Sequence, residues 1–370
     1  MPGPGLPADA VVHEANNNLD ATWHDGVLYL AWRTAPTHFA SSKAIVQVLA
    51  SDDGGHNWRL DYSVVARRDL REPRLVSWNG QLLLYWFTAG VKARKFQPDR
   101  IWVTQQVGPG RWRQPKAISP PGCVVWRVRP LADRLAMTVY RGAEQLFTAT
   151  PEPLTVELWG SEDGWRWEPF DRAHPVVHRG GAEAEFIELA DGRLLGVVRK
   201  EGPDGGWGSD IVSAPADELT AWTVRPDERK FDSPWLFLDR GNPFLVARRT
   251  LGQPRGRYDA LGAVEELLDT ELRIDPHRRT RLDQGLYWLT PKRTTLYSLD
   301  PDTCLASAVG DLPSAGDTAF AATVPVDGPG DGGGRHILFN YSSPRHHPWW
   351  PWVVGQLRPT RIEALDLTLL

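Results

Sequence analysis

The sequence predicts an all-β chain folded as a six-bladed β-propeller of four-stranded antiparallel blades, with a five-bladed ring as the alternative. The first observation is composition: 34 Gly and 31 Pro among 370 residues indicate many turns, and the apolar runs between them have strand length. The second is a tryptophan that recurs at a regular spacing, and the third is a hairpin pattern that recurs with it. We therefore expect a single propeller domain over residues 1–370.

Four tryptophans each follow an apolar strand and a short turn: Trp58, Trp112, Trp167 and Trp222. They are 54, 55 and 55 residues apart. A repeat of this length that contains several short strands is typical of propeller blades, whereas solenoid repeats are shorter and mostly helical.

A strand–turn–strand pattern precedes each of these tryptophans, and two further copies follow. The six copies lie within residues 19–33, 71–87, 126–141, 184–199, 231–249 and 317–343. The pairs Asn79-Gly80 and Asp191-Gly192 are strong hairpin turns. Each complete unit is thus a four-stranded meander, and the number of copies predicts six blades.

Two segments fit the repeat less closely. Residues 352–370 should supply the outer strands of the last blade or pair with the N-terminal segment, because an open sheet edge invites aggregation. Residues 252–281 fit no blade strand, and their VEELLDTEL run predicts a short helical insertion.

Charge and cysteine content exclude several classes of partner. A net charge of −4 without a basic stripe indicates neither nucleic acid nor a membrane as a partner. The N-terminal residues lack the features of a signal peptide, so we expect a cytoplasmic protein. Cys123 and Cys304 have no metal-ligand spacing, and we expect neither a metal nor a cofactor. Nothing in the sequence indicates the oligomeric state.

The stretch ASDDGGHNW, residues 50–58, has two interpretations. Acidic residues at alternate positions can bind calcium, but this stretch lacks a distal bidentate glutamate. A tight turn is favoured, because Asp and Ser side chains accept hydrogen bonds from nearby amides and glycine supplies a positive φ. In a four-stranded blade this turn lies on the face opposite the central pocket.

The central pocket should be built from the starts of first strands and the ends of second strands. The residues at the first-strand starts are Asp20, Glu72, Arg127 or Arg129, Glu183 or Glu185, Asp232 and Asp317. The second-strand ends supply Arg33, Arg141, Arg199, Arg248 and Tyr341, and Arg74 lies in the same REPRL stretch as Glu72. Charged groups are seldom buried unless they are paired. These residues therefore either form a polar substrate pocket or pair with one another and stabilise the ring. We expect Trp32, Trp86 and the PWWPW run at 348–352 to be exposed for sugar stacking.

Several of these motifs resemble the sialidase (neuraminidase) superfamily. Ser51-Asp53-Gly55-Trp58 and the shorter Ser161-Asp163-Gly164-Trp167 resemble its Asp-box, the BNR repeat. GAEAEFIELADGRLLGVVRKE resembles the blade that carries a glutamate and an arginine, here Glu183 (or Glu185) and Arg199. FNYSSP resembles the stretch that carries the tyrosine nucleophile, here Tyr341.

The resemblance implies hydrolysis of an anionic sugar. Tyr341 would be the nucleophile, activated by a neighbouring carboxylate because a phenol is a poor nucleophile at neutral pH. Arg33, Arg199 and Arg248 would clamp the acidic sugar. Asp20 lies near the place of a family arginine, and His38 is the one proton donor available in the loop where the family has an acidic residue.

A resemblance to five-bladed furanosidases gives a second template, in which Asp20, Glu72 and Glu185 serve as base, acid and pKa tuner.

Three functions therefore stay open. The first is a sialidase-like glycoside hydrolase, or a related sugar-cleaving enzyme, that acts on an acidic or polar sugar. The second is a non-catalytic propeller that binds a glycan or a protein. The third is a lyase or isomerase of intracellular metabolism that uses the carboxylates and His38. If the protein is an enzyme, we expect its chemistry to depend on Glu72 and on Glu183 or Glu185 more than on Tyr341.

Overall fold

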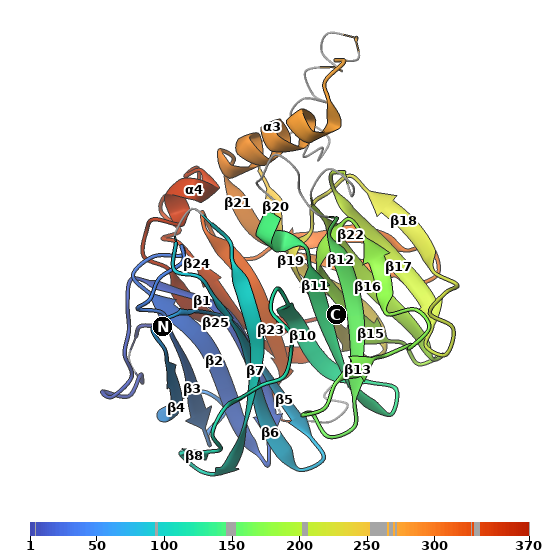
Figure 1. Cartoon of the computed structure of the whole chain (residues 1–370). Helices are drawn as coiled ribbons and strands as arrows, with labels where there is room; N and C mark the ends of the chain where they lie inside the picture. Colours follow the sequence, from blue (N-terminus) through green and yellow to red (C-terminus); the bar gives the residue numbers. More distant parts are fainter. Residues whose placement is uncertain are drawn as a thin grey trace.

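Six antiparallel sheets follow one another along the chain and form the blades of a propeller (Figure 1). The computed structural model describes residues 1–3, 5–92, 95–145, 153–201, 206–251, 265, 269–270, 272–326, 328 and 334–369. The six-bladed prediction is confirmed, and the five-bladed alternative is wrong.

The strands of each blade pair in sequence order, except that the last two short strands of blades 2 and 3 both pair with the third strand. Blade 1 contains β1 (Ala15–His24), β2 (Val27–Ala35), β3 (Ile45–Ser51) and β4 (Arg59–Val65). Blade 2 contains β5 (Asp69–Trp78), β6 (Gln81–Ala89), β7 (Pro98–Gly108), β8 (Arg111–Trp112) and β9 (Lys116–Ala117). Blade 3 contains β10 (Val124–Leu131), β11 (Arg134–Arg141), β12 (Thr155–Ser161), β13 (Glu168–Pro169) and β14 (Val176–Arg179).

The second half of the ring follows the same plan. Blade 4 contains β15 (Gly181–Glu188), β16 (Arg193–Lys200), β17 (Ser209–Pro215) and β18 (Thr223–Asp227). Blade 5 contains β19 (Asp232–Asp239), β20 (Asn242–Thr250), β21 (Lys292–Asp300) and β22 (Leu305–Asp311). Blade 6 has three strands, β23 (Thr318–Pro325), β24 (Arg335–Ser342) and β25 (Arg361–Thr368).

Two α-helices in the described part of the chain cover one end of the propeller (Figure 1). Helix α3 (Pro276–Trp288) lies between β20 and β21, and α4 (Trp352–Gly355) lies between β24 and β25. The α3 helix begins where it does because the Asp275 side chain caps the Arg278 amide and proline occupies the first turn. Five of the nine residues of the VEELLDTEL run lie outside the described residues, so the helix predicted there stays a prediction.

Every innermost strand has a β-bulge near its start. The register shifts lie between Asn17 and Leu19, Arg71 and Arg74, Val125 and Arg127, Gly181 and Ala184, Asp232 and Trp235, and Ala319 and Ala322. Four bulge residues have a positive φ, namely Asn18 (46°), Glu72 (51°), Ser233 (52°) and Phe320 (53°). Because a bulge adds a residue to one strand, it interrupts the alternation of side chains at the axis.

The turn at residues 51–58 holds itself together. Ser51 Oγ accepts a hydrogen bond from the Gly55 amide at 2.8 Å, and Asp53 Oδ1 accepts from the His56 and Asn57 amides at 3.0 and 2.8 Å. The Asp53 carboxylate is therefore occupied by the turn. Within the described ranges, no group of three His, Cys, Asp or Glu residues could hold a metal ion. The geometry matches the structural interpretation of this stretch.

The four repeated tryptophans all lie at or just before a fourth strand and are half-buried. Three of them pack on an aromatic ring of the preceding blade, whereas Trp222 packs on its own blade. The ring pairs are Trp58–Phe339, Trp112–Tyr62, Trp167–Tyr85 and Trp222–Phe186. Since Phe339 belongs to blade 6, Trp58 connects the first blade with the last.

The C-terminal strand and the N-terminal segment complete the ring. Thr360 Oγ1 accepts from the Asn16 amide at 2.8 Å and donates to the Asn16 carbonyl at 2.9 Å. The Thr360 amide also donates to Glu14 O, and the Ile362 amide donates to Met1 O. The terminal run thus provides a strand of blade 6 and also contacts the N-terminal segment. No helix in the described part of the chain has the length and apolar character needed to span a membrane.

Candidate functional site

A cavity of about 520 Å³ lies at the end of the propeller that carries α3 and α4. Blades 1 to 4 and both helices contribute to its wall, so it lies over the axis of the ring. Its aromatic side chains include Phe39, Phe96, Trp288 and Trp352. Its ionisable side chains are His38, Arg71, Lys95, Tyr140, Arg199 and Glu201. A volume of this size falls in the range of small-molecule sites, about 300–1,000 Å³.

The wall formed by blade 2 carries an excess of positive charge. Asp69 accepts from Arg33 Nη2 at 2.7 Å and from Arg71 Nε at 2.5 Å. Arg33 is fully buried, while Arg71 reaches the cavity. One carboxylate therefore balances two guanidinium groups, and the exposed Lys95 adds a further cation to the same wall.

His38 reaches the cavity from the loop after β2 and is oriented by a buried carboxylate. Its Nδ1 lies 2.7 Å from Asp317 Oδ2. The other oxygen of Asp317 accepts from Tyr341 Oη at 3.1 Å and from Trp352 Nε1 at 3.0 Å. Nε2 of His38 makes no hydrogen bond with any described residue. Burial lowers the pKa of His38 below its usual value, although Asp317 opposes the shift, so the imidazole is neutral at neutral pH.

Tyr140, from the end of β11, is the second titratable group open to the cavity. Its phenol oxygen has no hydrogen-bond partner within the described part of the chain. Burial raises the pKa of Tyr140 well above its usual value, and the negative charge of Glu183 adds to the shift. Arg199 and Arg71 are also close enough to influence this pKa. The phenol therefore stays protonated and can donate.

Glu72 lies beneath the wall of the cavity rather than in it. Its Oε1 accepts from Asn18 Nδ2 and its Oε2 from Arg74 Nη2, both at 2.8 Å. The residue is 6% exposed. Burial raises the pKa of Glu72 to about 7, and the charge of Glu183 adds to the shift. Glu72 thus titrates near neutral pH.

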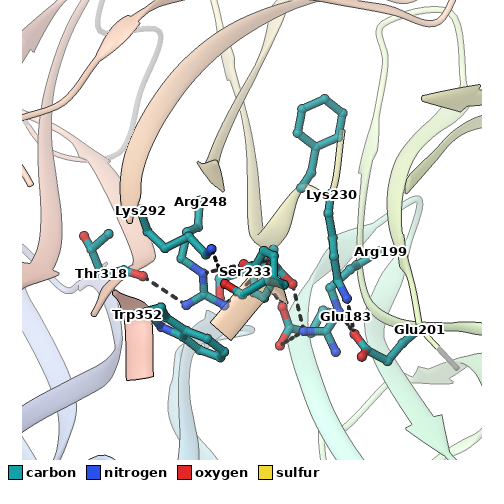
Figure 2. Close-up of polar contacts among 12 residues, drawn as sticks. Glu183, Arg199, Glu201, Lys230, Ser233, Arg248, Lys292, Thr318 and Trp352 are labelled. Carbon is teal, nitrogen blue, oxygen red and sulfur yellow. Dashed lines mark hydrogen bonds and ion pairs between the residues drawn. The ribbon is translucent and has the colours of Figure 1, made fainter. Parts of the chain in front are cut away.

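Glu183 and Arg199 are the centre of a second polar network (Figure 2). Arg199 Nη1 lies 2.8 Å from Glu183 Oε1 and 3.0 Å from Asp232 Oδ1. The Ser233 amide donates to Glu183 Oε2 at 2.6 Å. Figure 2 shows Arg199 and Lys230 converging on Glu201. Burial raises the pKa of Glu183.

Arg248 and Asp232 lie in the blade 5 part of this network. Arg248 donates to Tyr287 Oη and to the Thr318 carbonyl, and Trp352 covers its guanidinium group at 4.4 Å from the ring centroid (Figure 2). The Tyr287 phenol in turn donates to Asp232. Trp352 thus separates Arg248 from the cavity.

Glu185 and Asp20 are buried and bind groups that hold the ring together. Glu185 is fully buried and is paired with Arg127 at 3.0 Å and with Arg129. Asp20 accepts from the amides of Ala21 and Leu75, both at 3.0 Å, which joins β1 to β5. Burial raises the pKa of both carboxyl groups. These contacts agree with the interpretation that some of the paired residues at the axis stabilise the ring.

The structure brings most predicted site residues to the axis, but places few of them in the cavity wall. His38 and Arg199 line the cavity. The other predicted residues lie beneath or beside it: Asp20, Glu72, Glu183, Glu185, Tyr341, Arg33, Arg74, Arg127, Arg248, Asp232 and Asp317. The expectation that Arg33, Arg199 and Arg248 converge on one ligand is wrong, because Asp69 binds Arg33 and Trp352 covers Arg248.

The expectation that Trp32 and Trp86 are exposed is also wrong. They are 1% and 2% exposed, and each packs in an apolar core of the blades. Of the aromatics proposed for stacking, Trp352 in the PWWPW run lines the cavity. Arg141 is exposed and pairs with Glu157, and its neighbour Tyr140 takes the cavity position.

Sequence reasoning missed Arg71, Tyr140 and Trp288. Arg71 belongs to the same REPRL stretch as Glu72 and Arg74, and Tyr140 directly precedes Arg141. Arg71 and Tyr140 each lie one residue away from Glu72 and Arg141, the residues that the sequence placed in the pocket. Trp288 ends α3, whose start is marked by Asp275-Pro276, a cap and first-turn proline that the sequence does show.

No protein-family model matches the sequence, and no curated protein matches it. Solved structures do. A protein of unknown function from Dyadobacter fermentans aligns with a TM-score of 0.64 at 14% identity, over 99% of this chain and 100% of that one. The sialidase of Trypanosoma rangeli, in complex with sialic acid, aligns with a TM-score of 0.60 at 13% identity. The alignment covers 97% of this chain and 55% of the sialidase.

The chain shares its propeller fold with sialidases. An endosialidase of phage phi92 also aligns, with a TM-score of 0.58 at 10% identity, over 95% of this chain and 66% of that one. At these identities the likeness concerns the fold, since one fold carries many functions.

Proposed function

We propose that the protein is a sugar-cleaving enzyme that binds an acidic sugar in the axial cavity. The observation that carries this proposal is the composition of the cavity wall. Arg71 and Lys95 supply positive charge, Trp288 and Trp352 supply flat apolar surfaces, and His38 supplies an oriented proton-transfer group. Sugars stack on aromatic side chains, and guanidinium groups pair with carboxylates.

Tyr341 is a weaker candidate for the nucleophile than the resemblance to sialidases implies. Its side chain is completely buried, and its phenol donates to Asp317. Burial and the charge of Asp317 raise the pKa of Tyr341 well above its usual value. A substrate in the cavity would have to displace Trp352, which also binds Asp317, before it could reach this phenol.

Glu72 is better suited to proton transfer than Tyr341. A carboxylic acid with a pKa of about 7 is half protonated at neutral pH and can donate a proton to a leaving group. Glu183 is the second carboxyl group of the pair, and its charge raises the pKa of Glu72. Both act from beneath the wall of the cavity.

A specific observation favours a non-catalytic glycan-binding propeller as the second candidate. Glu72 is paired with Arg74 and Glu183 with Arg199, so arginines already neutralise both carboxylates while aromatic side chains converge on the cavity. In that case the cavity would bind an acidic sugar without cleaving it.

A panel of oligosaccharides tests the proposal and separates the two candidates. Oligomers of uronic acids and matched neutral oligomers are incubated with the protein, and mass spectrometry follows cleavage while thermal shift follows binding. We expect binding and cleavage of at least one acidic oligomer. Binding without cleavage supports the second candidate, and the absence of both contradicts the proposed function.

A further inference from the structure

Two proton-transfer groups in the cavity have free atoms, and an arginine connects them. His38 Nε2 and the Tyr140 phenol have no partner among the described residues, although both side chains line the cavity. Arg71 Nη2 donates to the His38 carbonyl at 2.9 Å, and its charge also acts on Tyr140. A neutral imidazole, a guanidinium group and a protonated phenol thus line the same cavity from blades 1, 2 and 3.

We propose that the enzyme cleaves uronic-acid oligosaccharides by β-elimination, with His38 as the base and Tyr140 as the acid. This inference rests on the proposed function and specifies its substrate and reaction. The substrate is a uronide whose carbon four carries the glycosidic oxygen that leaves. Elimination needs a cation at the carboxylate, a base at carbon five and an acid at the leaving oxygen.

Arg71 is the group that binds the carboxylate. Because Asp69 is shared with Arg33, the charge of Arg71 is incompletely balanced and is available to an anionic ligand. Arg199 is less available, since Glu183, Glu201 and Asp232 surround it. A carboxylate at Arg71 would lie beside both the base and the acid.

The reaction balances without water, metal or oxidant. His38 Nε2 takes the proton from carbon five, and the electron pair of that bond delocalises into the carboxylate held by Arg71. The pair then forms the double bond between carbons four and five as the bond from carbon four to oxygen breaks. Tyr140 gives its proton to the leaving oxygen. Proton exchange with solvent restores both side chains.

Asp317 is a positioning residue in this scheme. Its carboxylate lies 2.7 Å from His38 Nδ1, closer than the Asn17 side-chain nitrogen at 3.1 Å, so the proton is held at Nδ1 and Nε2 is left free to act as the base. Tyr341 and Trp352 donate to the other carboxylate oxygen and hold Asp317 in place. The resemblance to sialidases implies that a carboxylate beside Tyr341 activates it as a nucleophile. In this scheme the carboxylate beside Tyr341, Asp317, orients His38 instead.

The carboxylates of the axis are less suited to attack or to activate water. Each accepts hydrogen bonds from an arginine and from a neighbouring blade, with Asn18 at Glu72 and the Ser233 amide at Glu183. Both lie below the wall that His38 and Tyr140 help to form. Glu201 does line the cavity, but its carboxylate is paired with Arg199 and Lys230. His38 Nε2 and the Tyr140 phenol, which elimination uses, have no partner among the described residues.

The test incubates the full chain with trigalacturonate, trimannuronate and a hyaluronan tetrasaccharide. Elimination produces an unsaturated uronate that absorbs in the ultraviolet, whereas hydrolysis produces new reducing ends without this absorbance. We expect the absorbing product with at least one substrate. His38→Asn should lower kcat about a hundredfold or more, and Tyr140→Phe should also lower it, while KM changes little.

The matched control is His178→Asn. His178 pairs with Asp210 at 2.9 Å and its side chain is 11% exposed, close to the 12% of His38, but it lies outside the cavity. This control should keep full turnover.

New reducing ends without absorbance overturn elimination and leave the proposed function intact. An absorbing product that persists in His38→Asn overturns the assignment of the base. Binding without cleavage overturns elimination and favours the glycan-binding candidate.

Discussion

Glu72 is the residue whose surroundings set the pH behaviour of the axis. Its backbone has a positive φ in the bulge of β5, and its carboxyl group lies between Asn18 and Arg74. Burial outweighs the arginine and raises the pKa from 4.5 to about 7. An acid with a raised pKa binds more protons in the folded state, so its contribution to stability is largest at low pH.

The raised pKa of Glu72 predicts how the stability difference between the wild type and Glu72→Gln changes with pH. Between pH 4.5 and about pH 7 the wild type should lose stability relative to the variant, because glutamine does not titrate. The relative change should be about 3 kcal/mol, since one pKa unit corresponds to about 1.4 kcal/mol. Urea unfolding of both proteins across this pH range measures it. A stability difference that does not vary with pH contradicts the shifted pKa.

Residue identities at the axis could be predicted from the sequence only in part. The ionisable character of the strand starts was visible, and Glu72, Glu183 and His38 do lie at or near the cavity. The bulge residues were not visible, because nothing in the local composition of REPRL indicates that Glu72 adopts a left-handed conformation. Arg71 therefore reaches the cavity, although the position of Glu72 at the strand start predicted Glu72 there.

The repeated tryptophans act at the scale of the element. Their spacing predicted the blades, since each marks the start of an outer strand. The sequence did not reveal which surface each ring covers. Trp167 packs edge-on against Tyr85 of the preceding blade, with ring centroids 5.8 Å apart, and Tyr85 also donates to the Gly164 carbonyl at 2.7 Å. This turn thus joins blade 3 to blade 2.

Trp167→Ala should therefore destabilise the ring. We expect a loss of about 3 kcal/mol in the free energy of unfolding, through lost burial and the cavity left behind. The control is Trp349→Ala, because Trp349 is 71% exposed. Equilibrium unfolding in urea compares the two variants with the wild type. Equal stability of Trp167→Ala and the control contradicts the inter-blade role.

At the scale of the whole molecule, the ring gathers charges that are far apart in sequence. His38 of blade 1 meets Asp317 of blade 6 across 279 positions, and α3 and α4 close the same end of the axis. Such long-range contacts have no signature in a single sequence, which is why the cavity wall was predicted less well than the fold. The cytoplasmic location stays a prediction.

Isothermal titration calorimetry with a uronide and its neutral hexoside measures whether Arg71 binds an acidic sugar in the axial cavity. Arg71→Gln leaves Asp69 paired with Arg33, so the variant should fold. Arg172→Gln, at a guanidinium group that is 79% exposed, is the control. We expect the wild type and Arg172→Gln to prefer the uronide, more weakly at high salt, and Arg71→Gln to bind it about tenfold less tightly or worse. Equal affinity of the wild type for the uronide and the neutral sugar, or an unchanged affinity in Arg71→Gln, would contradict the binding of an acidic sugar by Arg71.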